Sequence, residues 1–138
     1  MKKNILLFLM IILITSGCSN KKLVCKRNMN NSSFEYSMEF KDDSIKTMNL
    51  YYDMDLTSYS NRQISMVEKQ DFCSKLKDNM KSFKDAFNNC KQEIIDEHLR
   101  VTANIDVSKI SKTTLEKIST SDKTKSLMEK QNYKCSVK

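Results

Sequence analysis

The stretch FEYSMEF, residues 34–40, decides the fold of this chain. Its large apolar side chains alternate with polar ones, and this period of two is typical of a β-strand with one buried and one solvated face. Two aspartates follow in a polar turn at 41–44, and a second alternating stretch runs from Met48 to Leu56. Residues 23–29 form a further strand before FEYSMEF. Because only short polar turns separate the three strands, the sequence predicts an antiparallel meander.

The apolar period changes from two to three or four residues after Ser60. The apolar side chains of this segment share one helical face, with Lys, Asp and Gln between them. They are Ile64, Val67, Phe72, Leu76, Met80 and Phe83. The pattern predicts one amphipathic helix of about 20 residues, which begins at Ser58 or Ser60, where a hydroxyl can cap the first turn, and fades near 86–89.

Strands return in the last third of the chain. Residues 90–95 and 99–107 form two of them, with a turn at 96–98 between them, and two short helices and a final strand are expected over 111–137. The predicted fold class is therefore α+β. It consists of an antiparallel β-sheet of about 5–6 strands, with one long helix and one or two short helices packed on it.

The chain contains no Pro, and Gly17 is its only Gly. Turns that require positive φ must then use Asn or Asp, which are the next most tolerant residues. The lack of Gly also excludes Gly-rich phosphate-binding loops. We expect positive φ among Asn30-Asn31, Asp42-Asp43, Asn88-Asn89, Asp96 and Asn132.

The first eighteen residues have the layout of a secretory signal peptide. A charged start precedes the apolar run Ile5 to Ile14, which is too short for a membrane span of about 20 residues. Thr15-Ser16-Gly17-Cys18 resembles the lipobox of bacterial lipoproteins, although Thr15 stands where that motif usually has Leu. In such proteins the cysteine is acylated and begins the mature chain. A plain cleaved signal peptide is the alternative.

This interpretation divides the chain into a lipoprotein signal peptide at 1–17, a lipidated tether at 18–22 and a single α+β domain at 23–138. It predicts a protein on the extracytoplasmic face of the cell membrane, anchored by palmitate or similar chains on Cys18. Basic side chains follow the anchor, and we expect them to face anionic lipid. They are Lys21, Lys22, Lys26 and Arg27.

The charge of the chain does not indicate a nucleic-acid partner. Without Lys2 and Lys3, 22 basic residues face 17 acidic ones, which leaves a net charge of +5. Basic and acidic residues are interleaved, without a block of five like charges, as on an ordinary solvated surface.

Four cysteines follow Cys18, and an even number in an exported chain predicts disulfide bonds. Four cysteines allow three connectivities, of which we favour Cys73–Cys90 with Cys25–Cys135. The first bond would fasten the long helix to the next strand, and the second would join the first and last strands. Zinc is the rival ligand, but spacings of 48, 17 and 45 residues contain no C-x₂₋₄-C knuckle.

Few residues are candidates for catalysis or metal binding. Asp53-x-Asp55 looks like the start of a calcium loop, but Ser58 stands where that loop needs Gly and Ile64 where it needs Glu. His98 is the only His, and we expect it to be an exposed turn residue. We therefore predict no catalytic residue, no metal site and no cofactor.

Three features together resemble the YehR-like family of small bacterial lipoproteins. They are Cys18, the segment IDVSKI at 105–110 and the ending LMEKQNYKC at 127–135. The order of expected strands and helices is similar as well, although Asn132 stands where the family usually has Gly. The resemblance covers nearly the whole mature chain. It implies an α+β fold on an antiparallel sheet and a membrane anchor, and it carries over no activity.

The sequence thus predicts a lipid-anchored extracytoplasmic lipoprotein, not an enzyme, that binds or scaffolds an envelope protein or small ligand it does not name. One alternative is an immunity or inhibitor lipoprotein with one protein partner, which would expose an apolar or charged patch. The other is an envelope-acting enzyme, which would show a pocket with convergent titratable groups.

Overall fold

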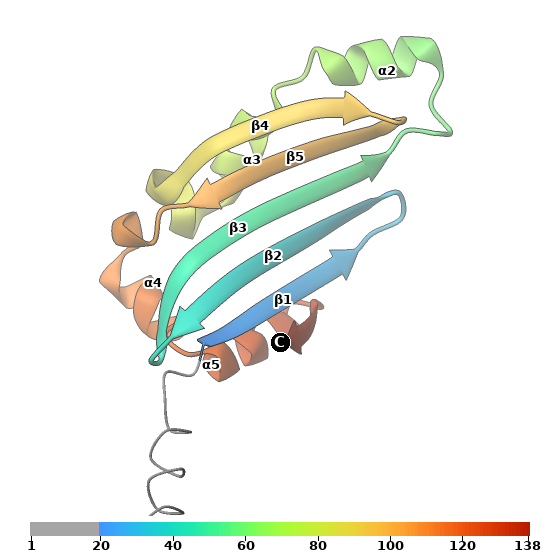
Figure 1. The fold of residues 1–138 in the computed structure, drawn as a ribbon. Helices are drawn as coiled ribbons and strands as arrows, with labels where there is room; N and C mark the ends of the chain where they lie inside the picture. Colours follow the sequence, from blue (N-terminus) through green and yellow to red (C-terminus); the bar gives the residue numbers. More distant parts are fainter. Residues whose placement is uncertain (1–19) are drawn as a thin grey trace, which may run out of the picture.

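The computed structural model describes residues 20–138, so the expected signal peptide and Cys18 lie outside the described residues. The described chain forms a six-stranded sheet in the order β4-β5-β3-β2-β1-β6 (Figure 1). All neighbouring strands are antiparallel, and the predicted meander of the first three is present. The strands are β1 (Asn20–Asn28), β2 (Ser32–Lys41), β3 (Ser44–Asp55), β4 (Phe87–Ile95), β5 (His98–Ile105) and β6 (Lys134–Val137).

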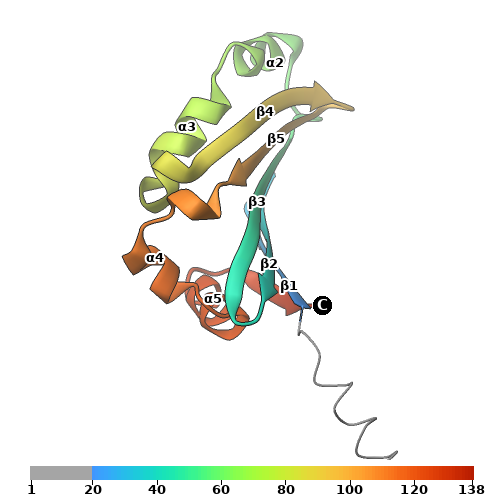
Figure 2. The ribbon, with the colours of Figure 1, turned by 60° about the vertical axis from the view of Figure 1, so that its left-hand side comes forward.

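The helices are short, and α3, α4 and α5 lie together on one side of the sheet, as Figure 2 shows. No helix among the described residues is long and apolar enough to cross a membrane. The helical elements are α2 (Asn61–Glu68), α3 (Phe72–Asn79), α4 (Lys112–Lys117), α5 (Ser121–Glu129) and the 3₁₀ turns η1 (Lys81–Ala86) and η2 (Val107–Lys109).

The strand face beneath the helices forms the core, because successive side chains of a strand point to opposite faces. The apolar residues of FEYSMEF and of the segment from Met48 to Leu56 supply this face, and Met38, Leu50 and Leu56 are fully buried or nearly so. One core cluster packs against α4 and α5, and a second packs against α2 and α3. The period-two pattern therefore predicted the buried face correctly.

The structure corrects the prediction of one long helix, because the segment after Ser60 is divided into α2, α3 and η1. Ser60 caps α2 as predicted. Asp71 begins a second helix, since its carboxylate accepts a hydrogen bond from the Ser74 amide at 2.9 Å. This bond and a second one from the Ser74 hydroxyl lower the pKa of Asp71.

Gln92 of β4 stabilises the break between α2 and α3. Its Oε1 accepts a hydrogen bond from the Phe72 amide at 2.8 Å, and its Nε2 donates to the Gln70 carbonyl at 2.8 Å. Helix ends leave such backbone groups without intrahelical partners. The helical period of the apolar residues continues across the break, so the sequence pattern alone did not reveal it.

We expect Gln92→Ala to lower the free energy of unfolding by about 1–2 kcal/mol, because two partly buried backbone groups lose their partner. Urea denaturation measures this change, and hydrogen exchange at the Phe72 amide should become faster. Gln131→Ala is the control, because Gln131 is exposed, and its effect should stay within about 0.5 kcal/mol. Equal effects of the two substitutions would contradict the capping role of Gln92.

Asp and Asn provide most of the positive-φ turns, as expected for a domain without Gly. Asp42 (φ 50°) and Asp43 (φ 56°) form the β2–β3 turn, and Asn132 (φ 65°) follows α5. The prediction also holds for Asn89 and Asp96, whereas Asn30-Asn31 has no positive φ. Glu97 (φ 61°) was not predicted. Its carbonyl accepts a 2.8 Å hydrogen bond from the Leu56 amide, which helps to hold the β4–β5 turn in place.

The structure contains the two disulfide bonds that the sequence analysis favoured. Cys25 of β1 lies directly opposite Cys135 of β6, with their Cα atoms 4.1 Å apart. Cys73 of α3 is bonded to Cys90 of β4 with Cα atoms 5.8 Å apart, so this bond fastens α3 to the edge of the sheet. The helix it fastens is the shorter α3, because the long helix is broken.

Peptide mapping without reduction should recover one peptide pair joined through Cys25 and Cys135 and another joined through Cys73 and Cys90. Reduction before digestion should abolish both pairs and serves as the control. A peptide that joins Cys25 to Cys73 or to Cys90 would contradict this connectivity.

The tether expected at residues 18–22 is partly strand. β1 begins at Asn20, and its first residues, Asn20, Lys21 and Lys22, pair with residues 39–41 of β2. The backbone of Lys22 also exchanges two hydrogen bonds with Lys138. Residues 20–22 of the expected tether are therefore part of the sheet and belong to the domain.

Candidate functional site

The sheet face opposite the helices, here called the open face, is polar where β3 and β5 pair at its centre. Three cross-strand rows of β3 and β5 form this region, namely Asn49–Asn104, Tyr51–Thr102 and Asp53–Arg100. Their neighbours along each strand point into the core, so these side chains point to solvent. The helices α3, α4 and α5 do not cover this face (Figure 2).

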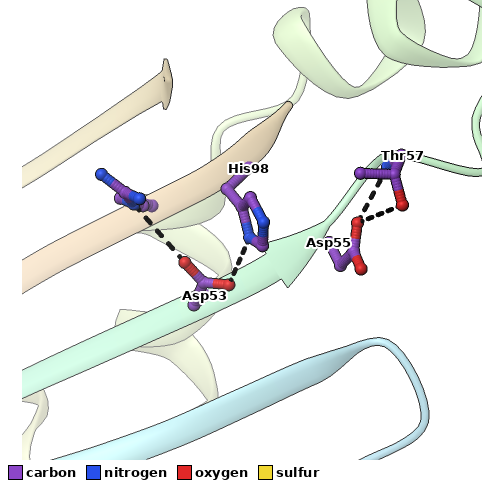
Figure 3. A network of polar contacts seen from close by, with 5 residues as sticks. Asp53, Asp55, Thr57 and His98 are labelled. Carbon is purple, nitrogen blue, oxygen red and sulfur yellow. Dashed lines mark hydrogen bonds and ion pairs between the residues drawn. The ribbon is translucent and has the colours of Figure 1, made fainter. Parts of the chain in front are cut away.

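A polar network on the open face joins the ends of β3 and β5 (Figure 3). The Nδ1 atom of His98 lies 2.8 Å from one carboxylate oxygen of Asp53, and Arg100 Nε lies 3.5 Å from the other. The Asp53 side chain is only 22% exposed. The His98 side chain is 33% exposed and His98 is the first residue of β5, so the prediction that it is an exposed turn residue is wrong. The β4–β5 turn is short, so His98 begins β5 opposite Asp55. Its side chain is hydrogen-bonded to Asp53.

The Asp55 carboxylate stabilises the local backbone after β3. Its carboxylate accepts hydrogen bonds from the backbone amide of Thr57 at 2.9 Å and from the Thr57 hydroxyl at 2.7 Å (Figure 3). These two bonds lower the pKa of Asp55. The carboxylates of Asp53 and Asp55 thus have different local partners. Within residues 20–138, no group of three His, Cys, Asp or Glu residues could hold a metal ion.

The hydrogen bond to Asp53 orients the imidazole of His98. An oriented imidazole is one of the groups used in general acid–base catalysis. Nucleophilic catalysis would also need a hydroxyl or thiol hydrogen-bonded to the ring. Among the described residues, the hydrogen bond of His98 is made to Asp53 alone. The chemistry that this arrangement supports is charge pairing across β3 and β5.

We expect Asp53→Ala to lower the free energy of unfolding by about 1 kcal/mol, because His98 and Arg100 both lose a half-buried partner. Asp78→Ala is the control, since Asp78 of α3 makes an exposed ion pair with Lys84 and lies on an element outside the network. Its effect should stay within about 0.5 kcal/mol in the same urea titration. A loss for Asp78→Ala as large as that for Asp53→Ala would contradict the role of the network.

A hollow of about 550 Å³, here called the lysine cavity, lies where β1 begins and the β2–β3 hairpin turns. Five lysines and one glutamate are the charged residues that line it. The lining residues are Asn20, Lys21, Lys22, Glu39, Phe40, Lys41, Lys46 and Lys138. The sheet pairing brings these residues together from β1, β2, β3 and the chain beyond β6, so a sequence pattern could not group them.

The structure separates the four basic residues that we expected to face lipid. Lys21 and Lys22 line the lysine cavity. Arg27 lies at the other end of β1, where its guanidinium stacks over the Tyr133 ring at 5.2 Å and donates to the Gln131 carbonyl at 3.5 Å. Arg27 is therefore a packing residue. Lys26 also lies toward that end and is exposed.

Comparison with known proteins adds little to this geometry. No protein-family model matches the chain, and no curated protein matches it. An NMR structure of a protein from Streptococcus pneumoniae TIGR4 is similar over 83% of this chain and 69% of that chain, with 14% sequence identity and a TM-score of 0.41. This similarity is too low to transfer a function or a site residue.

Proposed function

We propose that this chain is a lipid-anchored lipoprotein of the YehR-like type, held through Cys18 on the extracytoplasmic face of a bacterial cell membrane. The observation that carries the proposal is the sequence Thr15-Ser16-Gly17-Cys18, which resembles a lipobox and follows the apolar run from Ile5 to Ile14. β1 already includes Asn20, two residues after Cys18. Two residues span at most about 7 Å, so an acylated Cys18 would hold the sheet directly against the bilayer.

The disulfide bonds support export. Disulfides persist in oxidising compartments outside the cytosol and are rare within it. The two bonds close loops with sequence separations of 110 and 17 residues. Loop-closure entropy gives about 5 kcal/mol for the long loop and about 3 kcal/mol for the short one, which is a large share of a small domain's stability. A reducing cytosol would remove this stabilisation.

We further propose that the domain has a non-catalytic binding or scaffolding role, with the open face as its contact surface. Several groups with shifted pKa values have structural tasks that support this assignment. Bonds from the Ser108 hydroxyl and amide lower the pKa of Asp106, which caps η2, and burial in the core raises the pKa of Tyr36.

The distribution of exposed apolar residues gives less support to an immunity role in which one protein partner binds an apolar patch. Such a role would favour one contiguous exposed patch. Among the described residues, the large apolar side chains that are exposed lie on different elements or turns. They are Met29, Met66, Ile95 and Val137.

The anchor is tested by metabolic labelling with a fatty-acid analogue. We expect Cys18→Ser to abolish labelling and to block processing or release the protein from the membrane, because the thiol that carries the lipid is gone. Ser19→Ala is the matched control and should label like the wild type. Equal labelling of the wild type and Cys18→Ser would contradict the anchor.

A further inference from the structure

The lysine cavity concentrates positive charge that the protein itself does not neutralise. Among the described residues, none of its five lysines has a carboxylate within 4 Å in an ion pair, although several lysines elsewhere do. The cavity includes the carboxylate of Glu39, so lysines outnumber acidic side chains five to one in its lining. Asp42 and Asp43 form the adjacent turn but do not line the cavity.

The position of these lysines is fixed by backbone pairing rather than by long flexible loops. Lys22 is held between β2 and Lys138, opposite Glu39. Lys41 and Lys46 flank the tight β2–β3 turn on its two strands. Phe40, which belongs to the core and is 4% exposed, is also among the lining residues. The cavity is therefore lined by lysines of β1, β2 and β3 together with Lys138.

We propose that the lysine cavity binds the phosphate of an anionic phospholipid headgroup in the membrane that holds the protein. This inference rests on the proposed anchor at Cys18, which would place the cavity at the depth of the headgroups. A phosphate is the chemical match because it is a compact anion with several acceptor oxygens, and lysines bind it as point charges. The headgroup contact orients the domain, with the far end of the sheet and α2 away from the bilayer (Figure 1).

The position of the cavity favours lipid over a soluble polyanion. Anionic lipid attracts each nearby Lys or Arg by about 1 kcal/mol, and this attraction falls off within a Debye length of about 8–10 Å. The start of β1 would lie within this distance of the anchor. Arg62 in the first turn of α2 and Lys69 at its C-cap, at the opposite end of the sheet, would lie beyond it.

The test uses the full chain extracted from membranes and reconstituted into phosphatidylcholine vesicles with or without phosphatidylglycerol. An amine-acylating reagent labels exposed lysines, and mass spectrometry measures the rate at each site. An attraction of about 1 kcal/mol slows labelling roughly fivefold, so we expect Lys41 and Lys46 to label about five times more slowly with phosphatidylglycerol. Lys69 should not change. Salt at about 1 M should reverse the protection.

A matched pair of variants separates the cavity from general charge. Lys41→Gln with Lys46→Gln should weaken the protection of Lys21 and Lys22 by phosphatidylglycerol. Arg62→Gln with Lys69→Gln removes the same charge from exposed positions and should leave that protection unchanged. Equal effects of the two double variants would overturn the proposal.

The remaining outcomes distinguish the headgroup site from the anchor. If the chain floats with both kinds of vesicle but Lys41 and Lys46 label equally in both, the headgroup site is wrong and the anchor stands. If the chain floats only with phosphatidylglycerol, the headgroup site stands and the anchor is wrong.

Protection already present in detergent would mean that the chain's own N-terminal segment fills the cavity. Equal protection by inorganic phosphate would assign the cavity to free phosphate. Either of these two results would overturn the proposal.

Discussion

The pairing of β3 with β5 is the interaction on which the rest of this structure depends. Eight residue pairs join the two strands, from Met48–Ile105 to Asp55–His98. Since β2 occupies the other edge of β3, β4 must take the outer edge beside β5 and run parallel to β3. Two parallel strands of one sheet need a crossover connection, and α2, α3 and η1 supply it. The Cys73–Cys90 bond and Gln92 then fix this connection to β4.

One covered face and one open face follow from this arrangement. The crossover helices bury the half of the sheet around Leu50 and Val101, and α4 and α5 bury the half around Met38 and Phe40. The chain then pairs with β1 as β6 at the edge of the sheet, and the Cys25–Cys135 bond joins these two strands. No helix is left to cover the other face, so its side chains are polar and pair across strands, as Asp53 does with His98 and Arg100.

The same sheet brings together the lysines that we propose to contact the membrane. The lysine cavity takes residues from the start of β1, both sides of the β2–β3 turn and the chain after β6. These segments lie far apart in the sequence, and antiparallel pairing brings them to the same end of the sheet. The proposed anchor and the lysine cavity lie at the same end of β1, so a single orientation on the bilayer satisfies both.

The sequence alone determined the approximate strands, the buried face and the positive-φ turns at Asp42, Asp43 and Asn132. It predicted disulfide bonds and left three connectivities, of which the structure contains the favoured one. These features depend on local alternation, local backbone preference and the even count of cysteines. Only the tertiary structure decided the break at residues 69–71, because its cap comes from Gln92, some twenty residues away along the chain. It also moved His98 from a turn into a hydrogen bond with Asp53 and brought Lys41, Lys46 and Lys138 to Lys21 and Lys22. Strand order and register place these residues together, and neither can be read from the pattern of one segment.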